Sequence, residues 1–189
     1  MEEILRGESV ILGVTGSIAA YKAAVLASGL TQAGALVDVV MTEAAREFVT
    51  PLTFSGLTHR KTYTDIWEAE RKPGHVALAE RPDIVVVAPA TANTMAKMAQ
   101  GLADNLLTSI LLATRKPVLL APAMNSGMWE APATARNLER LRADGIRLVG
   151  PKSGGLACGD RGIGRMAEPA EILAAIGEWL AEIAAARWC

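Results

Sequence analysis

Short runs of apolar residues alternate along the chain with longer segments in which apolar positions recur every three or four residues. Runs that are apolar throughout and bounded by turn residues predict strands buried on both faces. They fall at residues 9–14, 36–41, 83–88, 117–121 and 146–149. The periodic segments predict helices at residues 18–33, 42–49, 131–144 and 169–187, and a helical region that follows Thr94, continues to about Thr114 and breaks at Gly101.

The alternation of buried strands with helices is typical of a parallel sheet that is covered on both faces. Right-handed crossovers make such a sheet doubly wound, so we predict an α/β fold with three layers, α/β/α. Ligands of these folds bind beyond the carboxyl ends of the strands. Loops at residues 16–18, 89–94 and 122–129 follow predicted strands and are expected at that one edge. No repeat or linker divides the sequence, and we predict one domain over residues 1–189.

Residues 151–166 contain five glycines, three cationic side chains and one thiol, without hydrophobic periodicity. We do not expect such a segment to contribute to the core, and a loop of this length in a compact domain is usually functional. Its glycines permit a hinge, and its cations suit a phosphate or a carboxylate. We therefore predict a flap at about residues 151–168 that closes over a small anionic molecule and supplies Cys158 as a reactive group.

The overall composition limits the classes of function. The 189 residues carry a net charge of −1 and are 51% apolar, so we expect neither nucleic acid nor a membrane as a partner. The apolar runs are too short to span a bilayer and the N-terminus lacks a signal-peptide pattern, which predicts a cytoplasmic protein. Two cysteines and two histidines, without metal-binding spacing, favour neither a disulfide framework nor a zinc site.

The loops at the predicted ligand edge offer several candidate binding groups. Gly16 and Ser17 open a helix, where backbone amides and a hydroxyl bind phosphate well, although a plain strand-to-helix turn has the same pattern. The small residues from Ala90 to Thr94 admit a flat ring, although simple N-capping of the next helix by Asn93 or Thr94 has the same pattern. Asn125 offers a neutral amide that can hold a carboxylate without the strong attraction of a cation, and a turn role is equally open.

Five motifs occur in a fixed order and are together much more specific than any one of them. They are GSIAAYK at residues 16–22, PATANT at 89–94, GLADNLLT at 101–108, PAMNSGMW at 122–129 and ACGDRGIGRM at 157–166. In this combination the chain resembles the flavin-containing cysteine decarboxylases over about residues 8–170. The resemblance implies a Rossmann-like domain that binds FMN. It also implies a carboxy-lyase that converts 4'-phosphopantothenoylcysteine to 4'-phosphopantetheine and carbon dioxide in coenzyme A biosynthesis.

The same resemblance implies roles for individual residues. It places Asn125 and Met128 at the carboxylate and the cysteine moiety of the substrate. His75, which taken alone is more often structural than catalytic, becomes a proton-transfer residue, and Cys158 becomes the proton donor that completes a redox-neutral reaction. The residues implied near the FMN phosphate and ribityl chain are Gly16, Ser17, Ile18 and Thr42, and those implied around the flavin are Thr91, Ala92, Asn93, Thr94 and Ala123.

The resemblance also implies partners and leaves alternatives. Family members form homotrimers or larger trimer-based oligomers with the flavin between subunits, and a ligase domain is commonly fused to or associated with the bacterial ones. An oxidative peptidyl-cysteine decarboxylase would share FMN, His75 and Asn125, but Cys158 argues against it. A flavin prenyltransferase would need an arginine- and glutamate-bearing motif that this sequence lacks. A non-catalytic regulatory subunit is disfavoured because His75, Asn125 and Cys158 are all present.

Overall fold

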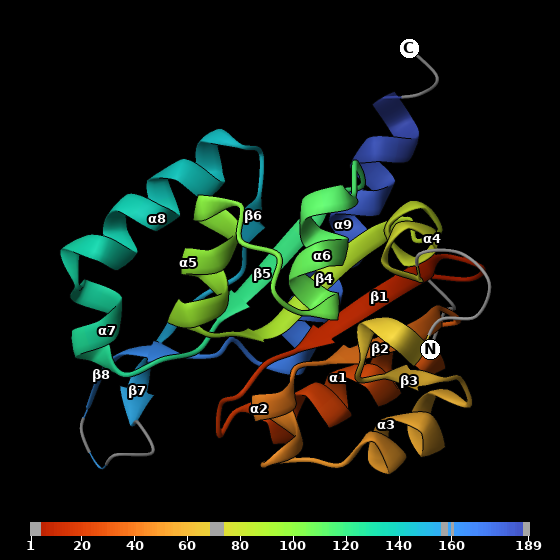
Figure 1. Ribbon diagram of the computed structural model, residues 1–189, viewed down its shortest axis with the longest axis horizontal. Helices are drawn as coiled ribbons and strands as arrows, with labels where there is room; N and C mark the ends of the chain where they lie inside the picture. The colour runs from red at the N-terminus through yellow and green to blue at the C-terminus, as the bar shows by residue number, and fades with distance from the viewer. Residues whose placement is uncertain (1–4, 69–73, 156–158, 160, 187–189) are drawn as a thin grey trace.

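The computed structural model describes residues 5–68, 74–155, 159 and 161–186 of the chain. Its centre is a parallel six-stranded sheet with the order β3-β2-β1-β4-β5-β6 (Figure 1). This is the strand order of the Rossmann fold, and the predicted doubly wound α/β architecture is therefore confirmed. The strands are β1 Ser9–Val14, β2 Leu36–Met41, β3 Thr62–Tyr63, β4 Ile84–Ala90, β5 Val118–Pro122 and β6 Arg147–Leu148.

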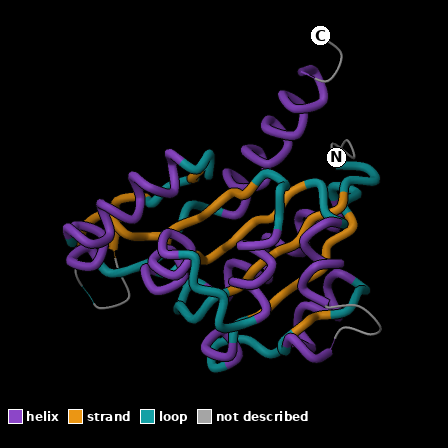
Figure 2. Tube along the Cα trace, turned by 45° about the horizontal axis from the view of Figure 1, so that its top comes forward, coloured by secondary structure: helices purple, strands orange, loops and turns teal. Residues whose placement is uncertain are grey.

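Helices cover both faces of the sheet (Figure 2). Alternate residues of each strand supply the two resulting cores, since Val10 and Leu12 of β1 face one core and Ile11 faces the other. Burial on both faces explains why β1 is apolar throughout, and it confirms the three predicted layers. The first core includes α1 Ala20–Gln32, α2 Glu43–Arg46, α3 Pro51–Thr58 and α9 Pro169–Ala186, and the second includes α4 Gly74–Glu80, α5 Ala92–Gln100, α6 Leu106–Ala113 and α8 Pro132–Ala143.

Several boundaries differ from the sequence predictions. Helix α1 begins at Ala20 rather than at residue 18, which leaves residues 15–19 as a loop. The sequence predicts only a stop at Pro51, but this proline also begins α3, because its fixed φ suits the first turn of a helix. The unpredicted elements β3, α3, α4, η1 Ile66–Glu68 and α7 Ser126–Glu130 are all too short for periodicity to reveal them.

The flap differs most from its prediction, which gave this segment no role in the core. Its described residues form two antiparallel strands, β7 Lys152–Gly155 and β8 Arg161–Arg165. Met166 follows directly and is only 1% exposed within the first core. The N–H of Met124 donates to the carbonyl of Gly164 at 3.0 Å. A Cβ atom on Gly164 would lie 2.1 Å from the Met124 carbonyl oxygen, so this anchor to the loop after β5 requires glycine.

A buried carboxylate links strand β2 to the chain just before β3 and to the chain just after α4. Asp38 of β2 is 3% exposed. Arg60, which precedes β3, donates from Nε and Nη2 to its two oxygens at 2.8 and 3.0 Å, and Arg81, which follows α4, donates to it as well. The hydrogen bond to Asp38 raises the pKa of the Arg60 guanidinium. A buried charge is tolerated when it is paired and hydrogen-bonded in this way, and loss of a partner is strongly destabilising.

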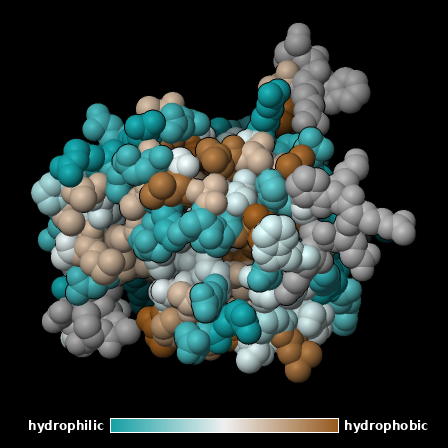
Figure 3. All heavy atoms as spheres, viewed as in Figure 1, coloured by the Kyte–Doolittle hydropathy of each residue, from teal (hydrophilic) through white to brown (hydrophobic). Residues whose placement is uncertain are grey.

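Figure 3 shows a face on which polar side chains are interspersed with apolar ones. The exposed large apolar side chains include Ile18, Tyr21 and Val25, at or just before the start of α1 and along its outer side. None of the helices that the structure describes is both long enough and apolar enough to cross a bilayer.

Candidate active site

The loops that follow β1, β4 and β5 surround a cavity of about 610 Å³ at the carboxyl edge of the sheet. We call it the loop cavity. Its lining includes nine of the residues that the sequence implicates in binding, and the structure therefore brings all three predicted loops together. The nine are Gly16, Ser17, Thr42, Thr91, Ala92, Asn93, Thr94, Ala123 and Met128.

Hydrogen bonds join the first of these loops to the second. Thr15 is 1% exposed, and its hydroxyl donates to the carbonyl of Pro89 at 2.7 Å. The N–H of Thr91 in turn donates to the Thr15 hydroxyl at 3.2 Å. Because one buried hydroxyl is bonded on both sides, the end of β1 and the start of α5 keep a fixed separation at the wall of the loop cavity.

The N-cap residues of three helices line the loop cavity. They are Thr42 of α2, Thr91 of α5 and Asn105 of α6, and each side chain accepts a backbone N–H of its own helix. Helix N-termini attract anions, since their unpaired N–H groups and dipoles point outward. Lys97 on the wall pairs with Asp104 at 2.6 Å, which lowers the pKa of that carboxyl, and Glu43 also lines the cavity. The helix N-termini, and not a free cation, therefore suit the cavity to a ligand with an anionic group.

The first loop also lies directly against the loop after β2. There Thr42 caps α2, its hydroxyl accepting the N–H of Ala45 at 3.3 Å. A Cβ atom on Gly16 would lie only 2.5 Å from the Cβ of Ala44. A glycine is therefore required where the two loops meet, and the close approach shapes this side of the loop cavity.

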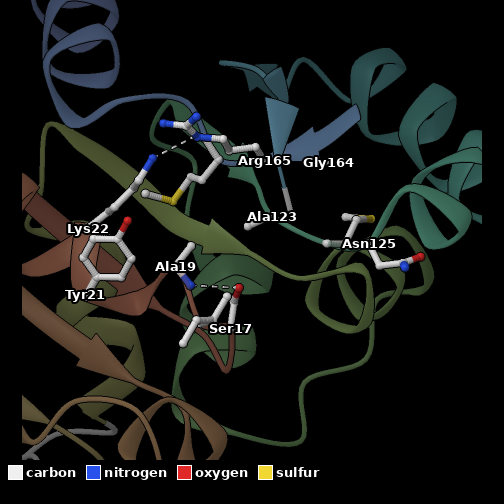
Figure 4. Close-up of a pocket in the computed structure, with 12 residues that line it drawn as sticks. Ser17, Ala19, Tyr21, Lys22, Ala123, Asn125, Gly164 and Arg165 are labelled. Atoms are coloured by element: carbon white, nitrogen blue, oxygen red, sulfur yellow. Dashed lines mark hydrogen bonds between the residues drawn. The ribbon is translucent and has the colours of Figure 1, made fainter. Parts of the chain in front are cut away.

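A second cavity, of about 570 Å³, lies between the first loop, the loop after β5 and the described strands of the flap. We call it the flap cavity. It shares Ser17, Ala123 and Met124 with the loop cavity, so the two adjoin. Figure 4 shows that Lys22 and Arg165 lie together at one end and that Asn125 lies at the other. The flap cavity therefore has a cationic end and a neutral amide end.

The ammonium group at the cationic end is unusually buried. Lys22 is 7% exposed and lies among the buried residues of α1, close in sequence to Ala23 and Leu26. Its Nζ donates to the carboxylate of Glu168 at 2.9 Å and faces the carbonyl of Met166 at 3.5 Å. A buried ammonium is stable only when it is paired. No role for Lys22 is predicted from the sequence, although a lysine on the apolar face of a predicted helix is a usable signal.

At the opposite end, Asn125 caps the short helix α7. Its Oδ1 accepts the N–H of Met128 at 3.2 Å. This bond orients the amide, whose nitrogen carries the two hydrogens that a carboxylate can accept. Asn125 lines the flap cavity and Met128 lines the loop cavity, so the loop after β5 contributes to both.

Three described residues among those implicated do not line the loop cavity: Ile18, His75 and Asn125, the last of which lines the flap cavity. Ile18 lines the flap cavity instead and is 58% exposed. His75 is the second residue of α4 and lines neither cavity. Its Nδ1 is buried and has no hydrogen-bond partner among the described residues. Cys158 lies outside the described residues.

The strand order and the two cavities define an α/β protein with a ligand site at the carboxyl edge of its sheet. A family model described as Flavoprotein matches residues 2–181, and the chain belongs to this family. Membership indicates that the cofactor is a flavin.

Curated relatives carry the name coenzyme A biosynthesis bifunctional protein CoaBC. The Bacillus subtilis (strain 168) protein is 47% identical over 173 residues, which is 90% of this chain and 42% of that protein. The Escherichia coli (strain K12) protein is 44% identical over 171 residues, which is 89% of this chain and 42% of that protein. The chain thus spans less than half the length of these relatives.

Solved structures of decarboxylases are also similar to this chain over most of its length. A cysteine-to-serine variant of PPC decarboxylase, complexed with pantothenoylaminoethenethiol, is 38% identical with a TM-score of 0.82, over 92% of this chain and 98% of that one. The FMN-dependent cysteine decarboxylase SpaF is 34% identical with a TM-score of 0.83, over 95% of this chain and 99% of that one.

Replacement of Gly16 by alanine is expected to lower flavin occupancy at least about tenfold, because the new Cβ forces the first loop away from Ala44. Occupancy is measured as the ratio of flavin to protein absorbance after purification. Gly56→Ala in α3 is the matched control, since its Cβ would meet nothing within 4 Å. Full occupancy in Gly16→Ala would show that this contact does not shape the cofactor site.

Proposed function

We propose that this chain is an FMN-dependent decarboxylase that converts 4'-phosphopantothenoylcysteine to 4'-phosphopantetheine. The observation that carries the proposal is the flap cavity, which has Lys22 and Arg165 at one end, Asn125 at the other, and a shared wall with the loop cavity. A substrate with a phosphate at one end and a cysteine carboxylate at the other matches this distribution of charge. The relatives named for coenzyme A biosynthesis and for PPC decarboxylase support the assignment.

The residues of the loop cavity fit FMN. The helix N-termini and the hydroxyls of Ser17 and Thr42 suit its single phosphate, and the small residues from Thr91 to Thr94 admit a flat ring. The close approach of Gly16 to Ala44 leaves no space there for a larger side chain. When bound, the flavin supplies reversible two-electron chemistry beside the substrate, and the protein supplies position and protons.

The protein's own groups divide the remaining work. Lys22 and Arg165 bind the substrate phosphate, and the Asn125 amide binds the carboxylate, so the substrate is held from both ends. A neutral amide orients the carboxylate without stabilising it as strongly as a cation would, which favours its departure as carbon dioxide. His75 assists proton movement and Cys158 donates the proton that completes the product, as the family resemblance implies.

The position of His75 supports an oligomeric site. Since it lines neither cavity of its own chain, we propose that a homotrimer or a trimer-based assembly brings His75 of one subunit to the cavities of another.

The curated relatives are bifunctional and more than twice as long as the matched segment. We therefore also propose that a second, ligase domain is fused to this one or associates with it.

Mass spectrometry of 4'-phosphopantothenoylcysteine incubated with the flavin-loaded protein, without added reductant, tests the function. We expect a product lighter by one carbon dioxide and otherwise unchanged. A product that has also lost two hydrogens would instead indicate an oxidative peptidyl-cysteine type of decarboxylase. This is the second candidate, because the chain is also similar to SpaF, which is named an FMN-dependent cysteine decarboxylase. An unchanged substrate in the presence of full flavin occupancy would refute the proposal.

A further inference from the structure

The cations of the flap cavity share one counter-ion that does not itself line the cavity. The Nζ of Lys22 and Nη2 of Arg165 both donate to the same oxygen, Oε1 of Glu168. The Glu168 side chain is 48% exposed, while that of Lys22 is 9% exposed. Lys22 and Arg165 line the flap cavity and Glu168 does not, so the carboxylate bonds both cations from outside the lining of the cavity.

We infer that Glu168 is a positioning residue that holds Lys22 and Arg165 side by side as a two-cation clamp for the substrate phosphate. The inference rests on the proposed function and assigns specificity for a phosphate monoester to this pair. Two donors bonded to one carboxylate oxygen are neighbours, at a spacing that the oxygens of one phosphate group can bridge. The fork of Arg165 and the point charge of Lys22 then present hydrogens to different phosphate oxygens.

Glu168 is arranged to orient the cations and not to compete for them. An ammonium has three hydrogens and a guanidinium has five, so the bonds to Glu168 leave donors that can face the cavity. Without its counter-ion, the buried Lys22 ammonium would be costly, and we expect its flexible side chain to turn toward water. The hydrogen bond from Lys22, with a second from Arg165, lowers the pKa of Glu168. The carboxylate therefore stays ionised at every pH above the usual titration range of a carboxyl, and Lys22 and Arg165 keep their charged partner there.

A second glutamate in the same turn provides a matched control. Glu171 accepts the N–H of Glu168 at 3.0 Å, as in a capping box at the start of α9, and pairs with Lys152 of β7 at 2.6 Å. It therefore also ties the flap to α9, and it carries the same charge. Unlike Glu168, it makes no bond to either cation of the flap cavity among those described.

The test compares Glu168→Gln with Glu171→Gln on 4'-phosphopantothenoylcysteine and on pantothenoylcysteine, which lacks the phosphate. For Glu168→Gln we expect KM for the phosphorylated substrate to rise about tenfold or more, with kcat changed little and KM for the other substrate unchanged. For Glu171→Gln we expect the ratio of the two KM values to equal that of the unaltered protein. Flavin absorbance and thermal unfolding of both variants show whether either has lost its fold.

The outcomes separate this inference from the proposed function. If the unaltered protein turns over neither substrate, the proposed function itself is wrong. If it turns over the phosphorylated substrate but Glu168→Gln has an unchanged ratio of KM values, or affects both substrates equally, the clamp is refuted while the function stands. A lower KM for the phosphorylated substrate in Glu168→Gln would show that the carboxylate competes with phosphate, which also refutes it. Partial recovery of the ratio by Glu168→Asp would support the role of the carboxylate.

Discussion

Asn125→Asp is expected to lower kcat/KM for decarboxylation at least about 100-fold while the flavin stays bound. Aspartate caps a helix as well as asparagine does, so the hydrogen bond from the N–H of Met128 and helix α7 should persist. The change therefore replaces only a neutral amide by a carboxylate that, in the proposed site, faces the substrate carboxylate. At an effective dielectric constant of about 20, two like charges about 4 Å apart repel by about 4 kcal/mol.

The rate of carbon dioxide release and the flavin absorbance are measured on the same sample. Asn137→Asp serves as the control, because it adds the same charge on α8 and this residue lines neither cavity. An unchanged rate in Asn125→Asp would remove this side chain from the carboxylate site. Loss of flavin together with activity would instead indicate that the substitution disturbs the adjoining loop cavity.

Cys158→Ser is expected to release carbon dioxide but to stop at an unsaturated enethiol product. A serine hydroxyl is a far weaker acid than a thiol, so the last proton is not delivered. Without oxygen, the yield should stop near one carbon dioxide per active site, since the electrons taken from the substrate are not returned. The PPC decarboxylase structure that carries a cysteine-to-serine substitution holds pantothenoylaminoethenethiol, which supports this expectation.

Mass spectrometry distinguishes the enethiol from 4'-phosphopantetheine by two hydrogens. Cys189→Ser is the matched control, because Cys189 is the only other cysteine in the sequence. The control should form the saturated product at the normal rate. Formation of saturated product by Cys158→Ser would exclude this thiol as the proton donor.

Much of the fold could be predicted from the sequence because the sheet is buried on both faces. Strands such as β1 and β4 are then apolar throughout, and the helices between them keep their own period. The short edge elements could not be predicted in this way. Strand β3 has two residues, and α4, which carries His75, has seven.

The candidate site shows the same division. The loops after the strands are placed by topology, so residues such as Ser17, Thr91 and Asn125 could be assigned to one edge. Lys22 and Glu168 could not, because their pairing joins α1 to the start of α9, positions 146 residues apart in the chain. The core role of Met166 was equally hidden, since a single buried residue after a glycine-rich segment has no periodicity.

The buried carboxylate of Asp38 has a consequence for how this family can diversify. Arg60 and Arg81 are bonded to the same side chain, so the segment between them, which contains β3 and α4, is tied to β2 at both of its ends. The segment therefore behaves like a loop whose two ends are cross-linked, with the two salt bridges to Asp38 in place of a disulfide. We therefore expect changes of length within this segment to leave the register of β2 and the carboxyl edge of the sheet as they are.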